Sequence, residues 1–157
     1  MHREPFTPEG LLKAKARLKQ LREVERPNVV KAIEEARAHG DLSENAEYHA
    51  AKDLQGFIEA EIRQLEGITG RSQLIDPKKL SGDRVVFGAT VTVFDPDRDE
   101  EHTYKIVNTC VSDTDLGHIS YQAPIARALI GKEIGDEVIV KLPGGERTLE
   151  ILEVEFV

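Results

Sequence analysis

The chain has 157 residues, a formal net charge of −8 and a single cysteine. This length allows one ordinary domain or two small modules. A lone cysteine excludes an internal disulfide and a thiolate metal site, so we expect a reducing, cytoplasmic setting. No apolar run reaches the roughly 18 residues that a membrane-spanning helix needs, so no membrane partner is expected. The acidic charge argues against a protein that coats duplex DNA through a general basic surface.

The first part of the sequence predicts one long helix from Thr7-Pro8 to about His39. Threonine can cap free amides, and proline suits the first helical position. Apolar residues at three-four spacing then fit a narrow seam against one partner helix: Leu11, Ala14, Leu18 and Leu21. The seam slips and resumes at Val29, Ile33 and Ala36. A kink is expected at Pro27, because proline removes a helical hydrogen bond.

A second helix is predicted from about Leu42 to Gly67, after Gly40 ends the first. Because the connection is short, the two helices should fold back on each other as an antiparallel hairpin. Its apolar stripe consists of Ala51, Leu54, Ile58, Ile62 and Leu65.

The second half of the chain predicts a small antiparallel sheet with one short helix, so the fold class is α+β. Strand patterns cover 84–94, 102–107, 137–142 and the alternating end of the chain, and the helix runs from Pro124 to Ile130. Proline, glycine and polar residues indicate a linker at 77–83. The predicted division is a hairpin over 1–76, this linker, and a sheet domain over 84–157.

Asp41 and Glu44, in the turn of the hairpin, allow two interpretations. The common one is a capping box, in which Asp41 accepts an amide hydrogen bond and Glu44 reaches back to the cap. The other is a metal site, since residues three apart at a helix start lie side by side. Two carboxylates suit a Mg²⁺ ion that is shared with a nucleic acid and a second protein. Any catalysis at such an exposed tip must take place inside a partner.

Other charged residues near the turn give weaker signals. His39 and His49 flank it at a spacing that is no ligand motif, so exposed histidines are the better interpretation. Arg37 and Lys52, on opposite arms, could contact RNA phosphates or be solvated surface charges. The acid-free basic stretch at 13–22 is typical of a wet helix face, but a nucleic-acid or acidic partner stays open.

Four blocks, at 35–55, 85–93, 124–132 and 143–146, resemble the GreA/GreB family of transcript-cleavage factors. They read EARAHGDLSENAEYHAAKDLQ, VVFGATVTV, PIARALIGK and PGGE, and they follow the family's order over nearly the whole chain. The resemblance implies an N-terminal coiled-coil hairpin and a C-terminal FKBP-like domain. It also implies a role in transcription elongation, in which the factor stimulates RNA polymerase to cleave backtracked RNA and is not itself an enzyme.

The resemblance also assigns residues and partners. The C-terminal domain would dock on bacterial RNA polymerase at the rim of the secondary channel. The hairpin tip would then reach the active site and the 3′ end of backtracked RNA. Asp41 and Glu44 would act in trans on a Mg²⁺ ion shared with the polymerase, with no tightly bound cofactor, beside a basic patch of Arg37 and Lys52. The docking segment is implied at Pro124, Ile125, Ala126 and Arg127. Ala123 departs from the serine that is common in the family, which affects one docking hydrogen bond.

Two other functions stay open from the sequence. An FKBP-like domain could be a peptidyl-prolyl isomerase, although the second half has few aromatic residues and no tryptophan to line a pocket. A structural adaptor whose Asp41 and Glu44 only cap a helix is the other alternative.

Overall fold

The computed structural model describes residues 2–40 and 44–157. Its contacts divide the chain into two compact units. One unit is Leu12–Arg71, and the other joins Met1–Leu11 to Ser72–Val157. None of the described helices is long and apolar enough to cross a membrane.

These units differ from the predicted division in two places. Strand β1 (Glu4–Phe6) pairs in parallel with β2 (Ser72–Leu74), which ties the start of the chain to its second half. The segment predicted as a linker contains a 3₁₀ turn at Pro77–Lys79, and Pro77 is buried. The first residues therefore belong with the C-terminal part, and part of the linker segment is folded.

The first arm of the hairpin consists of α1 (Pro8–Gln20), a π-helical turn (Leu21–Glu25) and α2 (Arg26–Arg37). At its start the Thr7 hydroxyl accepts a 3.0 Å hydrogen bond from the N–H of Gly10, as predicted for a cap. The elements follow one another without a gap, so the arm is the long helix that the sequence indicates.

The π-helical turn explains why the apolar seam slips by one residue. Leu21 is fully buried, and the next buried seam residue is Val29, one position later than the three-four spacing requires. The N–H of Arg26 donates to the carbonyl of Leu21, five residues back, which accommodates one extra residue. The irregularity lies directly before Pro27. Proline has no backbone N–H, so it cannot donate a regular helical hydrogen bond.

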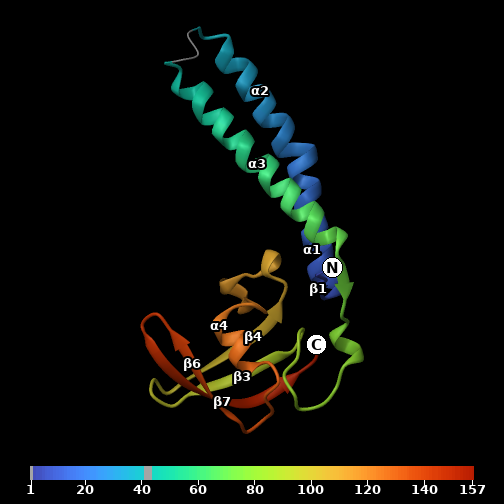
Figure 1. Cartoon of the computed structure of the whole chain (residues 1–157), viewed down its shortest axis with the longest axis vertical. Coiled ribbons are helices and arrows are strands. Elements are labelled where there is room, and N and C mark those ends of the chain that lie inside the picture. The colour runs from blue at the N-terminus through green and yellow to red at the C-terminus, as the bar shows by residue number, and fades with distance from the viewer. Residues whose placement is uncertain (1, 41–43) are drawn as a thin grey trace. The chain divides into compact units, whose positions relative to one another are not determined.

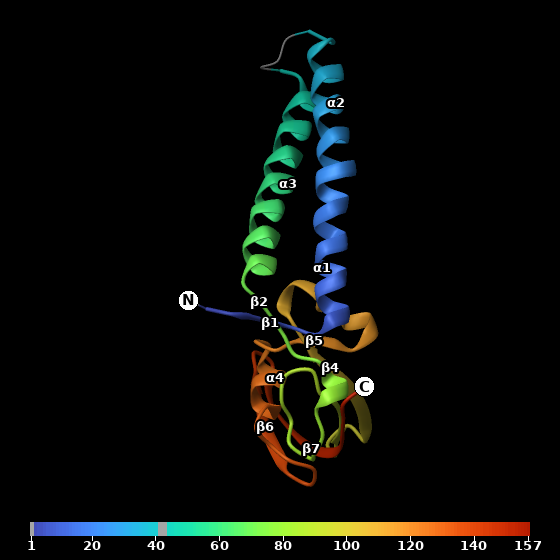
Figure 2. The same ribbon diagram turned by 90° about the vertical axis from the view of Figure 1, so that its right-hand side faces the viewer.

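The second arm is α3 (Ala46–Gly70), and Figures 1 and 2 show it running beside α2. It begins four residues later than predicted and is capped by Asn45. Of the predicted stripe, Ile58, Ile62 and Leu65 are buried. Ala51 is half-buried and Leu54 is 52% exposed, so the seam narrows toward the tip.

Arginines of the first arm pair with glutamates of the second. Arg17 makes a bidentate contact with Glu61 at 2.8 and 2.9 Å, and Arg22 reaches Glu66 at 3.2 Å. The Arg17 guanidinium lowers the pKa of the Glu61 carboxyl, against the opposing effect of its partial burial. Two cations of the basic stretch at 13–22 thus have acidic partners within the hairpin, which supports the interpretation as a solvated helix face.

The other unit contains a five-stranded sheet in the order β5-β4-β3-β7-β6. Its strands are β3 (Thr90–Asp95), β4 (Glu100–Val107), β5 (His118–Ser120), β6 (Glu137–Leu142) and β7 (Gly145–Glu155). Neighbouring strands are antiparallel except β4 and β5, which are parallel. The predicted α+β class is confirmed, with α4 (Pro124–Leu129) as the short helix and a mixed sheet in place of a purely antiparallel one. Two further 3₁₀ turns occupy Thr109–Val111 and Thr114–Leu116.

The core of this unit lies where α4 packs against the sheet. Strand β3 starts at Thr90 rather than at Arg84 because Gly88 adopts a φ of +88°, outside the extended region. The buried core residues are Val85, Ala89, Val91, Val93, Ile106, Ala126, Leu129, Val138, Val140, Leu149 and Ile151.

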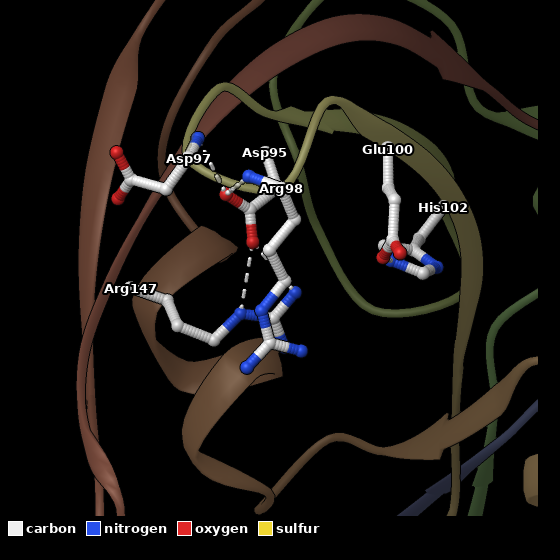
Figure 3. A network of polar contacts seen from close by, with 6 residues as sticks. All are labelled: Asp95, Asp97, Arg98, Glu100, His102 and Arg147. Atoms are coloured by element: carbon white, nitrogen blue, oxygen red, sulfur yellow. Dashed lines mark hydrogen bonds and ion pairs between the residues drawn. The ribbon is translucent and has the colours of Figure 1, made fainter.

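A buried ion pair closes the turn between β3 and β4 (Figure 3). Asp95 is 1% exposed, and one of its carboxylate oxygens accepts from Arg147 at 3.0 and 3.1 Å. The other oxygen accepts from the backbone N–H groups of Asp97 and Arg98. Burial raises the pKa of Asp95, but Arg147 and the two backbone donors outweigh it and hold the pKa below its ordinary value.

Candidate functional site: the tip of the hairpin

Of the two acids that the sequence predicts at the tip, the structure describes Glu44. Asp41 lies outside the described residues. Glu44 is exposed and stands directly before Asn45, the residue that caps α3. A capping box made by the predicted pair would require the helix to start before Glu44, whereas α3 starts at Ala46. Glu44 therefore lies outside the helix, and the side-by-side helical geometry expected for the pair does not apply to it.

Asn45 joins the two arms. Its Oδ1 accepts a 3.0 Å hydrogen bond from the N–H of Tyr48, which caps α3. Its Nδ2 donates a 2.7 Å hydrogen bond to the carbonyl of Ala36, in the last turn of α2. One half-buried side chain thus satisfies a free donor at the start of one helix and adds a second hydrogen bond to the Ala36 carbonyl, which also accepts from the N–H of His39 at 3.1 Å.

The two predicted basic residues flank the tip from opposite arms. Arg37 ends α2, and its guanidinium lies 6.0 Å from the centre of the Tyr48 ring, within the range of a cation–π contact. Lys52 lies on α3 and donates to Gln55 at 3.3 Å. Both cations are exposed. The arrangement leaves them accessible to a ligand beside the acidic tip.

The described surface around Glu44 is a shallow hollow of about 510 Å³ that is lined by His39, Glu44, Asn45, Ala46 and Glu47. Carboxylates suit a hard cation such as Mg²⁺. Within residues 2–40 and 44–157, no group of three or more His, Cys, Asp or Glu side chains could hold a metal ion. The described tip offers the carboxylates of Glu44 and Glu47, and oxygen ligands of this kind are the ones that a Mg²⁺ ion takes from a protein.

The predicted docking segment lies in α4. Pro124 and Arg127 are exposed and Ile125 is half-buried, whereas Ala126 is fully buried in the core. Ala126 therefore cannot contact a partner while the domain keeps this fold. Ala123 occupies the N-cap position and offers no side-chain cap to the helix.

Asn45 and Tyr48 are the tip residues that the sequence did not single out. A signal for Asn45 was present, because asparagine is among the strongest N-cap residues and is followed by a helical stretch. The cap lies four residues after Asp41, the position that the capping-box interpretation gives it. Tyr48 has no comparable signal, since its contact with Arg37 joins two helices.

Two family models match this chain. Residues 4–74 match a family described as transcription elongation factor, N-terminal. Residues 80–156 match the C-terminal family of transcription elongation factors GreA/GreB. Together the two models cover nearly the whole chain.

Individual relatives agree with these matches. The transcription elongation factor GreA of Rhodospirillum rubrum is 53% identical over 99% of both chains. The protein of the same name from Ruegeria pomeroyi is also 53% identical over 99% of both. Among solved structures, GreA factor homolog 1 (Gfh1) of Thermus thermophilus is similar at 24% identity, covering 98% of this chain and 99% of that one with a TM-score of 0.46.

Proposed function

Because this chain belongs to the GreA/GreB family of transcription elongation factors, we propose that it binds bacterial RNA polymerase and stimulates the cleavage of backtracked RNA. The chain acts in trans, so the polymerase remains the enzyme and this protein completes its active site. Its location is the cytoplasm, where the polymerase works. The observation that carries the proposal is the placement of Glu44 at the tip of the hairpin, exposed and outside the helix.

The described tip suits a substrate with negative phosphates. Glu44 offers a carboxylate that α3 does not need, since Asn45 caps the helix. Arg37 and Lys52 bring positive charge to the same end of the hairpin from its two arms, where they contact the phosphates near the 3′ end of the RNA. The hairpin thereby presents a metal ligand between cations that hold the substrate.

In the proposed mechanism, Glu44 and Asp41 contribute oxygen ligands inside the polymerase active site. These ligands would hold a Mg²⁺ ion shared with the polymerase, and that ion would supply the lowered pKa of a bound water and the stabilisation of the leaving oxygen. Glu44 orients that water against the phosphodiester by accepting one of its hydrogens. The exposed residues Pro124 and Arg127 of α4, with part of Ile125, form the docking surface on the rim of the polymerase secondary channel.

Substitutions of the two acids test the proposal. We expect Asp41→Asn and Glu44→Gln each to lower the cleavage rate of backtracked complexes on the order of 100-fold, because a neutral amide is a poor ligand for Mg²⁺. Binding to polymerase, measured by competition with the unaltered protein, should not change. The measurement is the rate of RNA shortening at saturating factor.

Glu35→Gln is the matched control, since Glu35 is an exposed glutamate of α2 near the same end of the hairpin. It should cleave like the unaltered chain. Full cleavage by both acid variants would contradict the proposal and favour an adaptor that binds polymerase without contributing to its chemistry.

A further inference from the structure

Resting on this proposed function, we propose that Asn45 is a positioning residue: its bond from one arm of the hairpin to the other fixes the place of Glu44. The evidence is the pair of hydrogen bonds that the side chain makes, one to each arm. Neither bond involves a metal or a substrate, so Asn45 acts on cleavage through the position of Glu44.

The orientation of the Asn45 amide follows from its partners. A backbone N–H can only donate and a carbonyl can only accept, so Oδ1 must face Tyr48 and Nδ2 must face Ala36. An aspartate or serine in this place would still accept from Tyr48 and cap α3. Aspartate has no donor for Ala36, and the serine side chain is one atom shorter. The two functions of the asparagine side chain can therefore be separated by substitution.

The bond to Ala36 restricts the tip because it closes a short loop. It joins residues nine positions apart, at the end of α2 and the start of α3. Glu44 is bonded to Asn45 through the backbone, and consecutive Cα atoms are about 3.8 Å apart. The hydrogen bond that holds Asn45 against α2 therefore also limits the positions that the Glu44 carboxylate can take.

The contact between Arg37 and Tyr48 supports the same junction. It brings the last residue of α2 to the residue whose N–H Asn45 caps. Asn45 and Tyr48 are both half-buried, so water competes less for these contacts than at an open surface. The contacts of Asn45 and Tyr48 are therefore better shielded from water than the exposed side chain of Glu44.

The test compares Asn45→Asp and Asn45→Ser in the full-length chain, on backtracked polymerase complexes. Both variants keep the cap of α3 and lose the bond to Ala36, and only the first adds a charge. We expect each to lower the maximal cleavage rate about tenfold, since displacement of a catalytic group by about 1 Å has large effects. The factor concentration that gives half-maximal cleavage should not change. Asn28→Asp, the same substitution at an exposed site of α2, is the control and should cleave normally.

A purely structural role would instead weaken binding or melt the helix. Hydrogen exchange at the Tyr48 amide should show that the cap persists in both Asn45 variants. Normal maximal rates in both variants would overturn the inference, as would a loss that appears only as weaker binding. If the unaltered chain and Glu44→Gln both fail to stimulate cleavage, the proposed function itself is wrong and the inference is overturned with it. If Glu44→Gln lowers the cleavage rate but both Asn45 variants cleave normally, the proposed function stands and the inference about Asn45 is overturned.

Discussion

Asp95 shows how one carboxylate can determine a turn. It is fully buried yet charged, because Arg147 and two backbone N–H groups surround it. A buried charge without such partners would be strongly unfavourable. Asp95 directly follows the strand pattern that the sequence predicts at 84–94, and Pro96 comes next. The sequence does not indicate Arg147, because that partner lies 52 residues later.

The lowered pKa of Asp95 predicts acid sensitivity. A carboxylate whose pKa is lower in the folded than in the unfolded chain stabilises the fold fully at pH values above about 3.9, the ordinary value for aspartate. That stabilisation is lost as the pH falls through the folded-state pKa. We expect Asp95→Asn to unfold at a lower urea concentration at pH 7, and the difference from the unaltered chain to shrink below pH 4.

Asparagine at this position still accepts from the backbone of the turn, so the variant keeps those bonds and removes the charge together with the acceptor for Arg147. Asp97→Asn serves as the control, because the Asp97 side chain is exposed and only its N–H joins the network. Equal losses of stability in the two variants at pH 7 would contradict the assigned role of Asp95. Urea unfolding at several pH values measures both.

The acids of the tip show what the sequence could and could not predict at the scale of residues. Glu44 is exposed near the tip of the hairpin, and its part in a metal site stays a prediction. The capping interpretation of the pair was wrong for α3, since Asn45 takes that position. Several consecutive polar residues can cap a helix, and only the fold selects one of them.

Among the elements, the first arm shows that a shift in the apolar three-four spacing can reflect an irregularity of the helix itself. The sequence predicted the seam and its interruption before Pro27, and burial confirms both halves of the seam. The form of the interruption was not predictable from spacing alone. A kink and a π-helical turn both interrupt a seam, but only the second adds one residue to the helix.

The short parallel pair of β4 and β5 illustrates another limit. Strand β5 has only three residues, so no alternation of polar and apolar residues can indicate it. It pairs with β4 at the edge of the sheet, beside the four longer strands. Short strands form because their neighbours hold them in place, and that information is not local.

The start of α4 gives a prediction about stability. Ala123 occupies the N-cap without an acceptor, so a serine there should satisfy a free N–H. We expect Ala123→Ser to raise the free energy of unfolding by about 1 kcal/mol. Ala128→Ser, in the last turn of the same helix and packed against the core, has no free N–H to cap and should lower it. Urea unfolding compares the two, and a stabilisation by both variants would contradict the capping explanation.

At the scale of the whole molecule, the C-terminal unit is built from both ends of the chain. Asn108 is 1% exposed, and its side-chain amide donates to Glu4 and to the carbonyl of Pro5. The carbonyl of Phe6 accepts from the N–H of Ile75 at 2.8 Å. The sequence could not show this, because a three-residue strand far from its partner has no periodic pattern. Residues before the first helix therefore complete the sheet domain.

This arrangement predicts that Phe6 stabilises the C-terminal unit although it stands at the start of the chain. Phe6 is fully buried, so Phe6→Ala should lower the free energy of unfolding of that unit by about 3–5 kcal/mol. Leu74→Ala, in the paired strand, removes a side chain that is 59% exposed and should have a much smaller effect. Hydrogen exchange resolved by segment can follow β3 and β7 separately from α3. Unchanged exchange in β3 and β7 of the Phe6 variant would show that the N-terminal strand contributes little to the stability of the sheet domain.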